Sequence, residues 1–465
     1  MFDASRREFL AASALALSSS RVLGANDRIN IVLVGCGGRG HGHIGELSRN
    51  SKEARIVGVC DVHRDSRERA QAYVASITGQ QVPAYEDMRK AFEQKDVDAV
   101  IVATPNHWHA LATMWACQAG KDVYVEKPVT HNVAEGAQMI EVARRTHRIV
   151  QAGSQGRSIP HKIKAIQLVH DGVIGEVYLS RGLCYKLRPS IGHRDDSPVP
   201  AGLNWDMFLG PAPNRPFNAL RFKYNYHWFW DTGDSDIGAQ GIHELDLCRW
   251  AMGDVGWPKT VSATGGKFIW KDDQETPNTQ AATFDYGNFQ IMFEVRNLAT
   301  GHEGGLPIPD KTVYKAGRIP PDPYVPLGPA QPPPADNTIG NLFYGSKGWM
   351  ALDNNGFRVY KGNNNECIMD EQATRDTFHP PTGPDTTPHL RNFFAAIRSR
   401  NPKDLNAEIA VGVMSTNLCH LANVSYRVRR TLTIEAPGRI ANDEQANALM
   451  GPFYRNPYDI SAYSV

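Results

Sequence analysis

The stretch RINIVLVGCGGRG, residues 28–40, decides the fold of this 465-residue chain. Its first half is an almost unbroken run of aliphatic residues, which suits a parallel strand covered on both faces. Its second half places Gly35, Gly37 and Gly40 in the spacing G-x-G-x-x-G, and a helical pattern follows through Leu47. A strand, a glycine turn and a helix in this order predict a dinucleotide-binding unit.

The pattern outside this unit predicts two α/β domains. Strands expected at 55–60, 97–103, 122–125 and 149–151 alternate with helices at 64–76, 110–119 and 134–146. This alternation predicts a Rossmann-type, doubly wound parallel sheet. Several later strands are longer and alternate in polarity, and they are expected at 176–185, 260–270, 279–286, 290–295 and 349–352. They predict an α/β domain with a large, mostly antiparallel open sheet, closed by helices at 389–398 and 407–427.

The chain is accordingly divided into four parts: a leader at 1–25, a nucleotide-binding domain at 26–155, a second domain at 156–440 and a tail at 441–465. Paired arginines, Arg6 and Arg7, precede a short apolar run in the leader, in the manner of a twin-arginine export signal. We therefore expect export to the periplasm or beyond through the twin-arginine machinery; a basic amphipathic tail is the alternative. The proline-rich stretch 306–334 is expected to be an ordered segment on the surface or an arm that contacts another subunit.

The amino-acid composition argues against several classes of binding partner. The net charge is +1, from 50 basic and 49 acidic residues, which argues against nucleic acid and anionic membranes. No apolar run is long enough to span a bilayer. The seven cysteines form no CxxC pair, and the histidine pairs 41/43 and 107/109 lack supporting ligands, so no metal site is predicted.

The residues of the glycine turn, Gly35, Gly37, Gly38, Arg39 and Gly40, are expected to hold the cofactor pyrophosphate at a helix N-terminus. Asp61 ends the second strand, where a carboxylate accepts hydrogen bonds from the ribose hydroxyls and repels a 2′-phosphate. NAD is therefore favoured over NADP, although the nearby Arg64 weakens that preference.

Polar residues follow three further strands at the edge where ligands bind such sheets. Those expected at the cofactor are Thr104, Pro105, Asn106, His107, His109, Glu126, Lys127 and Gln155. Arg157 is expected at the substrate. Lys127 is the main catalytic candidate, because a partly desolvated lysine has a lowered pKa and can accept a substrate proton. A surface lysine is the alternative.

A second cluster lies at 238–246. His243 and Asp246 share a helix face, so His243 is expected to act as a proton relay or to orient the substrate, with Asp246 fixing its tautomer or capping the helix. Tyr226 and His227 belong to an aromatic segment that suits a sugar face as well as plain packing.

At these residues the chain resembles the glucose–fructose oxidoreductase and inositol dehydrogenase (Gfo/Idh/MocA) superfamily. The matching motifs, which run from residue 28 to about 250, are 35–40, Asp61, 104–109, 126–128 and 241–246. The resemblance implies an NAD-dependent oxidoreductase acting on the CH–OH group of a sugar or polyol. It also implies Lys127 as catalytic lysine, His243 as active-site histidine, and a homodimer or homotetramer.

One position departs from that pattern. Many members carry Asp four residues before the histidine, where this chain has Ala239. A lysine–aspartate–histidine relay is incomplete unless Asp236, also expected at the substrate, or Asp234 takes the part. The alternative is an NAD-dependent glycoside hydrolase or lyase that oxidises its sugar transiently and recycles the cofactor, although that branch usually has another residue at the place of Lys127. A non-catalytic dinucleotide-binding protein is the third possibility.

Overall fold

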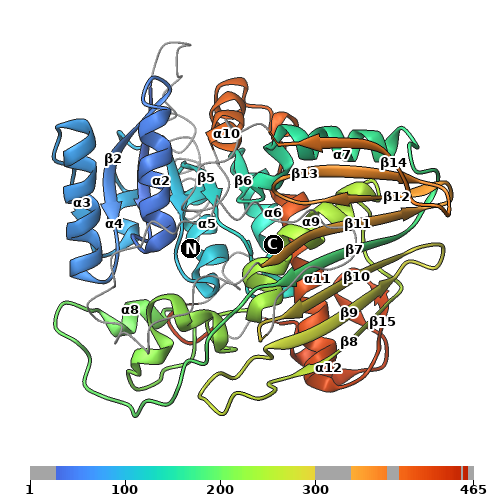
Figure 1. Cartoon of the computed structure of the whole chain (residues 1–465). Coiled ribbons are helices and arrows are strands. Elements are labelled where there is room, and N and C mark those ends of the chain that lie inside the picture. Colours follow the sequence, from blue (N-terminus) through green and yellow to red (C-terminus); the bar gives the residue numbers. More distant parts are fainter. Residues whose placement is uncertain (1–27, 299–336, 374–386, 452–453, 459–465) are drawn as a thin grey trace, which may run out of the picture.

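Two sheets organise the protein, as the computed structural model in Figure 1 shows for residues 28–298, 337–373, 387–451 and 454–458. The six-stranded sheet has the order β3-β2-β1-β4-β5-β6, and its strands all run parallel. Their bounds are β1 Ile29–Val34, β2 Ala54–Cys60, β3 Ala84–Tyr85, β4 Ala99–Val102, β5 Asp122–Val125 and β6 Val150–Ala152. Every side chain of β1, β4 and β5 is buried. The predicted doubly wound sheet is confirmed; β3, only two residues long, was missed.

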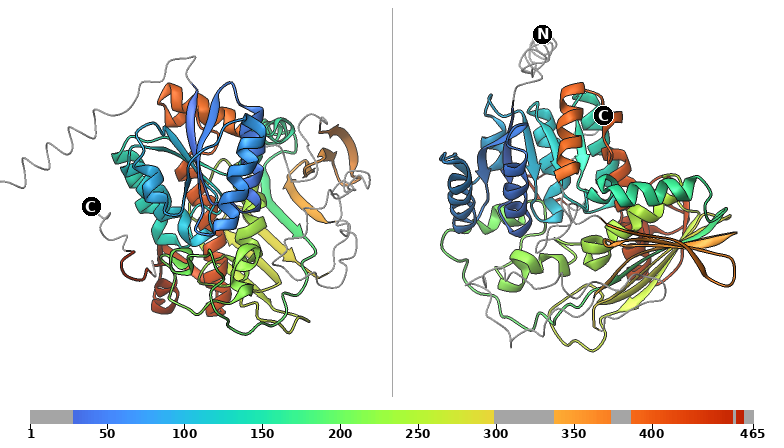
Figure 2. Two further views of the ribbon diagram at one scale, coloured as in Figure 1. Left: turned by 90° about the vertical axis from the view of Figure 1, so that its left-hand side faces the viewer. Right: turned by 45° about the horizontal axis from the view of Figure 1, so that its top comes forward.

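Helices cover both faces of this sheet (Figure 2, left). One face packs against α2 (Gly38–Arg49), α3 (Arg64–Thr78) and α10 (Thr387–Ser399). The other packs against α4 (Met88–Phe92), α5 (Asn106–Gln118) and α6 (Val133–Arg145). Helix α10 buries Leu390, Phe393 and Phe394 in the first of these cores. A helix that we assigned to the second domain therefore completes the first.

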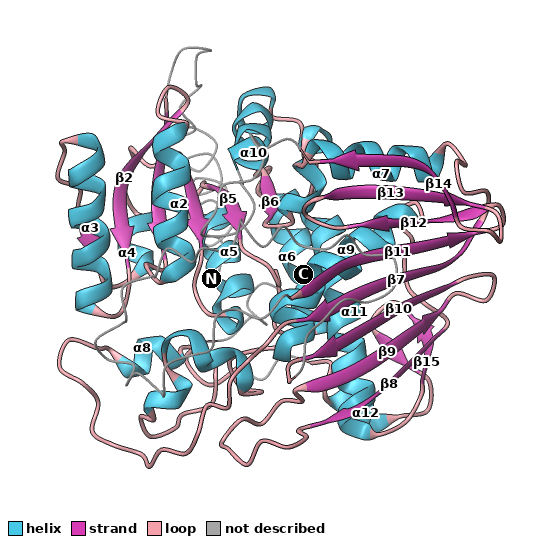
Figure 3. Ribbon diagram, in the orientation of Figure 1, coloured by secondary structure: helices cyan, strands magenta, loops and turns pink. Residues whose placement is uncertain are grey.

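The second sheet has ten strands in the order β14-β13-β12-β11-β7-β10-β9-β8-β15-β16 (Figure 3). Their bounds are β7 Val177–Tyr185, β8 Thr260–Gly266, β9 Thr279–Asp285, β10 Gln290–Arg296, β11 Thr338–Gly345, β12 Gly348–Leu352, β13 Gly356–Lys361, β14 Glu366–Gln372, β15 Leu432–Ala436 and β16 Arg439–Ile440. Only β7 and β10 pair in parallel, so the predicted mostly antiparallel sheet is confirmed.

One helix joins the two cores. The inner face of the large sheet packs against α7 (Pro160–His170), α9 (Ile242–Ala251) and α11 (Ile409–Val428), and α12 (Glu444–Ala448) follows near the end of the chain. At its start α11 buries Ile409 and Val413 in the core of the parallel sheet. Further along it buries Leu418 and Leu421 in the core of the second domain. This shared helix fixes the two domains relative to each other by close packing.

Residues 186–236, which we call the excursion, run from β7 across to the carboxyl edge of the parallel sheet (Figure 1). The excursion contains α8 (Trp205–Leu209) and 3₁₀ turns at Ala219–Arg221 and Lys223–Trp228. Leu203 forms a β-bridge with His63, and the Phe208 carbonyl accepts a hydrogen bond of 2.9 Å from His107 Nε2. The excursion thus brings second-domain residues to the strand ends.

No helix of the described residues is long and apolar enough to cross a membrane. The predicted export leader and the proline-rich stretch 306–334 lie outside the described residues.

Candidate active site

The glycine turn is shaped for a bound anion. Gly35 has φ +92°, and a Cβ at Gly40 would lie 2.0 Å from the Gly35 carbonyl oxygen, so both positions require glycine. No side chain caps the N-terminus of α2 at Gly37, and a Cβ at Gly37 or Gly38 would meet no atom within 4 Å. The N-terminus of α2 is therefore uncapped, and there is free space beside Gly37 and Gly38, as a bound pyrophosphate requires.

Asp61 lies beside this turn. Its carboxylate accepts hydrogen bonds from the backbone N–H of Cys36, at 2.7 Å, and of His63, at 2.8 Å. Burial raises the pKa of Asp61 although both N–H groups oppose the rise. The carboxylate stays partly exposed at the end of β2, the position expected for a ribose contact.

Two polar side chains at the strand ends are left without partners. Thr104 follows β4 and Gln155 follows β6. Thr104 Oγ1 and Gln155 Oε1 are buried, and neither has a hydrogen-bond partner among the described residues. Buried polar atoms without partners are rare in native proteins, so this pair fits a cofactor amide or ribose lying along the edge.

The two histidines expected at the cofactor hold backbone instead. His109 contacts the Pro128 carbonyl at 2.6 Å and the Thr104 carbonyl at 2.8 Å, which fixes the turn after β5. His107 contacts carbonyls of the excursion at Phe208 and Thr232. Burial lowers the pKa of both imidazoles, to about 3 for His107. Both are positioning residues, which corrects the predicted direct contact.

Asn106, the first residue of α5 after Pro105, connects the cofactor domain to the excursion. It donates to Asp234 Oδ2 at 2.9 Å and accepts from the Tyr226 hydroxyl at 3.2 Å. This contact holds the Asp234 carboxylate at Asn106, so Asp234 is not placed to relay a proton from Lys127.

Glu126 anchors the end of β5 to α2. Its Oε1 accepts hydrogen bonds from Arg39 Nε at 2.7 Å and His43 Nε2 at 2.9 Å, and Arg39 also pairs with Glu46. Burial raises the pKa of Glu126, but Arg39 and His43 outweigh it and hold the pKa well below its usual range. Arg39 and Glu126, both predicted at the cofactor, hold Lys127 in place through this ion pair.

Lys127 reaches across to the second domain. Its Nζ donates a hydrogen bond of 2.6 Å to the Ala239 carbonyl, in the π-helical turn Ile237–Gly241 (η4). Such wide turns recur at functional sites. The side chain is half-buried. Burial lowers the pKa of Lys127, and the charges of Arg39 and Arg188 lower it further, while Glu126 opposes them.

His243 lies one turn after Ala239, at the start of α9. Its half-buried imidazole has no hydrogen-bond partner among the described residues. Burial and the charge of Lys127 hold the pKa of His243 well below its usual value, so the ring is neutral at physiological pH. Lys127 thus lies close enough to His243 for its charge to act on the imidazole, and the catalytic roles of both residues stay predictions.

Arg157 and Asp246 do not join them. Arg157 is 3% exposed and makes bidentate contacts with Asp246 and with Asp254. Asp246 also accepts from Ser415 Oγ at 2.6 Å. The expected Asp246–His243 contact is not formed, and Arg157, predicted at the substrate, is occupied in a buried ion pair.

Asp236 is also occupied. It accepts from Arg188 Nη2 at 2.8 Å and from Asn297 Nδ2 at 2.6 Å. Arg188 holds its pKa below the usual range against the effect of burial. Among the described residues, no carboxylate oxygen lies within 4 Å of the Lys127 amine, so neither Asp236 nor Asp234 replaces the missing aspartate.

The aromatic segment lies beside these charges. The ring of Tyr226 stacks on His227 at 4.0 Å, and His227 Nδ1 contacts the Tyr224 carbonyl. Burial lowers the pKa of His227 to about 3, with a further effect from Lys127. Its Nε2 is without a partner among the described residues. Sequence reasoning missed Lys186 and Arg188, for which the only signal is two cations directly after a strand.

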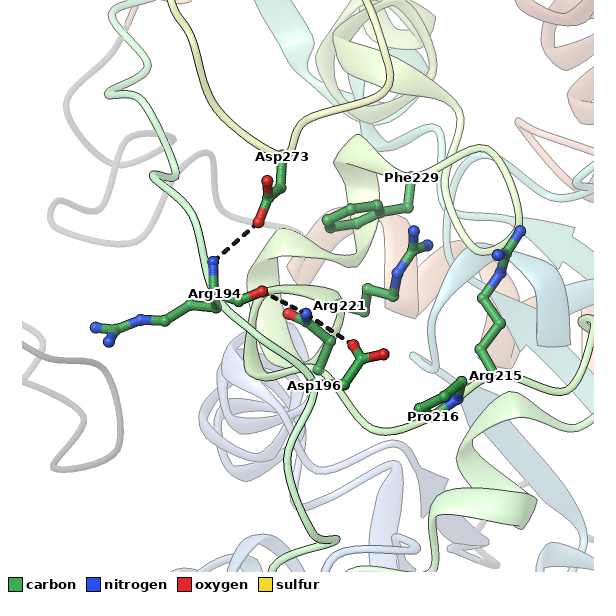
Figure 4. A pocket seen from close by; sticks show the side chains of 8 residues that line it. Arg194, Asp196, Arg215, Pro216, Arg221, Phe229 and Asp273 are labelled. Atoms are coloured by element: carbon green, nitrogen blue, oxygen red, sulfur yellow. Dashed lines mark hydrogen bonds between the residues drawn. The ribbon is translucent and has the colours of Figure 1, made fainter.

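A cavity of about 360 Å³ elsewhere in the excursion is a different feature (Figure 4). It is lined by Arg194, Asp196, Arg215, Pro216, Asn218, Arg221, Phe229 and Asp273. Arg221 pairs with Glu275 at 2.6 Å and Arg215 with Asp231. Neither Lys127 nor His243 lines it, so we place the chemistry elsewhere. The described residues contain no group of three or more His, Cys, Asp or Glu side chains placed to hold a metal ion.

Comparison with known proteins agrees with this geometry. Residues 29–154 match the model of an oxidoreductase family with an NAD-binding Rossmann fold, and residues 162–280 match its C-terminal α/β domain. Inositol 2-dehydrogenase 1 of Saccharopolyspora erythraea is 36% identical over 304 residues, covering 62% of this chain and 77% of that protein.

Two other similarities are more distant. Glycosyl hydrolase family 109 protein 1 of Akkermansia muciniphila is 27% identical over 158 residues, 32% of each chain, so the chain spans only a third of that relative. The WlbA dehydrogenase of Chromobacterium violaceum, solved with NADH and UDP-GlcNAcA, superposes with a TM-score of 0.62 at 16% identity, covering 88% of this chain and 97% of that one.

The fold and the glycine turn together define a class of two-domain proteins whose first domain is an NAD-binding Rossmann fold. Within that class, the chain belongs to the Gfo/Idh/MocA family.

Proposed function

We propose that the protein oxidises a CH–OH group of a sugar or polyol with NAD, using Lys127 as proton shuttle. The observation that carries this proposal is the half-buried Lys127 amine beside the unpartnered imidazole of His243, at the edge where the glycine turn opens. NAD supplies a hydride acceptor when bound.

The two side chains have distinct parts in this scheme. Because the pKa of Lys127 is lowered, a larger fraction of its amine is neutral near pH 7 and can accept the substrate hydroxyl proton. The neutral His243 ring can hold that hydroxyl through one nitrogen. The Ala239 carbonyl accepts a hydrogen bond but takes no proton, so it orients Lys127. The proton then leaves Lys127 for solvent, since no carboxylate of the described residues contacts the amine.

The test begins with the nucleotide. Denaturing the purified protein and identifying what it releases, or loading it with NAD, gives the starting complex for a screen of sugars followed by nicotinamide absorbance. Lys127→Ala is expected to lower kcat by about 10²- to 10⁴-fold, the usual contribution of a general base, with NAD binding retained. Lys90→Ala, an exposed lysine of the same domain, is the matched control. Wild-type turnover in Lys127→Ala would exclude the shuttle and favour a binding protein.

Redox-assisted cleavage of a glycoside, by a hydrolase or lyase that recycles NAD, is the second candidate. Ala239 in place of a relay carboxylate favours it, as does the similarity to a glycosyl hydrolase family 109 protein. Release of sugar from a nitrophenyl glycoside, without net change in nicotinamide absorbance, would select this activity over net oxidation.

We propose further that the cofactor is NAD in preference to NADP, because Asp61 follows β2 beside the glycine turn, where a carboxylate can accept hydrogen bonds from ribose hydroxyls and repel a 2′-phosphate. Export is proposed from Arg6 and Arg7, and cell fractionation of an Arg6→Lys/Arg7→Lys double variant tests it: retention in the cytoplasm is expected. A homo-oligomer is proposed from the family, and light scattering of the purified protein gives its mass.

A further inference from the structure

The strand that enters the site brings a second lysine to Lys127. Along β7 alternate residues face α9: Ser180 Oγ donates to the Cys248 carbonyl, and the backbone at Gly182 lies close to Glu244. Continuing the alternation, Lys186 Nζ donates to Gln240 Oε1 at 3.3 Å. Gln240 adjoins Ala239, whose carbonyl holds Lys127, so the two amines meet at one turn of η4.

The carboxylates of this region form their ion pairs with other side chains than these two lysines. Asp236 is bound by Arg188 at 2.8 and 3.2 Å and by Asn297. Glu126 is bound by Arg39 and His43. Among the described residues, no carboxylate oxygen lies within 4 Å of either lysine amine.

Two further observations describe the amine of Lys186. Glu244 faces the same region, and burial raises the pKa of its carboxyl, although the charges of Lys162 and Lys186 oppose the rise. Lys186 is half-buried, and its amine has three hydrogens to donate, of which the Gln240 contact uses one. Burial lowers the pKa of Lys186, and the charges of Arg188 and Lys127 lower it further, while Asp236 opposes them. Three cations, Lys127, Lys186 and Arg188, thus share this region with the carboxylate of Asp236, so a further anion would be stabilised here.

We propose that the substrate is a sugar acid, whose carboxylate binds Lys186 while its reacting hydroxyl lies at Lys127 and His243. This inference rests on the proposed oxidoreductase function. A carboxylate fits better than a phosphate for two reasons. The Lys186 ammonium carries one charge and keeps two hydrogens beyond the Gln240 contact, which a carboxylate can match. The guanidinium of Arg188, the kind of fork that suits phosphate, is occupied by Asp236.

Matched pairs of ligands test the inference. D-glucuronate and D-galacturonate are compared with D-glucose and D-galactose, in binding to the NAD-loaded protein by calorimetry and in kcat/KM. Each acid is expected to bind about tenfold or more tightly than its neutral counterpart, as for a hydrogen bond to a charged group. Lys186→Gln should abolish this preference, so that each acid binds no more tightly than its neutral counterpart. Lys186→Arg should restore most of it, and Lys271→Gln, an exposed lysine of the same domain, should have no effect.

The binding measurements, taken apart from kcat/KM, test this inference separately from the proposed function on which it rests. If acids bind through Lys186 but no sugar reduces NAD, the anion site stands and the oxidoreductase proposal fails. Equal binding of acids and neutral sugars overturns the inference. The inference is also overturned if the Lys186→Gln variant still binds the acids more tightly than the neutral sugars. Tighter binding of glucose 6-phosphate than of glucuronate would overturn the carboxylate assignment. Circular dichroism of each variant shows that the fold is kept.

Discussion

Replacing Glu126 by Gln tests how the site is held together. In the native protein this carboxylate, whose side chain is 5% exposed, binds Arg39 and His43. Removing one partner of a buried ion pair usually costs about 3–5 kcal/mol. Here Arg39 keeps Glu46 and is 31% exposed, and the new amide can still accept one hydrogen bond, so about 2–3 kcal/mol is the expected loss. For a domain of this size, that lowers Tm by about 5–10 °C.

The stability difference has a defined pH range. The folded-state pKa of Glu126 lies below its unfolded value, so the carboxylate stabilises the fold fully above the unfolded pKa. That contribution is lost as the pH falls through the folded pKa. The gap between wild type and Glu126→Gln should therefore be constant from about pH 6 to 8 and close only in acid, below the usual Glu pKa of about 4.3.

The same variant should move the activity profile. The Glu126 charge raises the pKa of Lys127, so its removal lowers that pKa. The neutral amine then forms at lower pH, and the acidic limb of the kcat profile should shift toward acid.

Calorimetric melting and pH–rate profiles measure both effects, with Glu93→Gln as control. Glu93 pairs with Lys90 on the surface, where both side chains are more than half exposed, and a change within about 0.5 kcal/mol is expected there. If Glu126→Gln has the Tm of the wild type, the proposed ion-pair contribution is wrong. If the acidic limb of its kcat profile does not shift, the coupling between this carboxylate and Lys127 is wrong.

Three further variants address other parts of the site. Gly40→Ala should weaken NAD binding about 10- to 100-fold in a fluorescence titration, since its Cβ would lie 2.0 Å from the Gly35 carbonyl oxygen. Arg157→Met leaves Asp246, only 2% exposed, without its cation and should cost about 3–5 kcal/mol in urea unfolding; the folded fraction should keep its KM. Asp61→Ser should raise the ratio of kcat/KM with NADP to that with NAD, and an unchanged ratio would contradict the ribose assignment.

The sequence predicted the features that depend only on residues close together in the chain. The glycine turn and Lys127 each follow an apolar strand within a few residues, so the parallel sheet itself places them at one edge. The pattern of β14 was missed because Glu366–Gln372 is a charged, largely exposed edge strand with no buried face to create an alternation. Helix α10 was found, but its docking on the first domain depends on contacts more than two hundred residues away in sequence.

Side-chain partners from distant segments explain the remaining errors. Arg157 follows a strand end as Gln155 does, and nothing in its neighbourhood indicates that Asp246, 89 residues later, will bind it. The carbonyl that holds Lys127 belongs to Ala239, 112 residues away, and a backbone group leaves no sequence signature. The same holds for Lys186, whose approach to Lys127 depends on the register of β7 against η4.

The pKa of Lys127 is consequently a property of both domains. Its amine donates a hydrogen bond to η4. The charges that act on it come from α2 and the end of β5 on one side and from the excursion on the other. A movement of one domain against the other would lengthen the bond to Ala239 and return the amine toward solvent, where its pKa would rise. Helix α11, with Val413 in one core and Leu418 in the other, resists that movement. The packing of α11 therefore sustains the lowered pKa of Lys127 that the proposed chemistry requires.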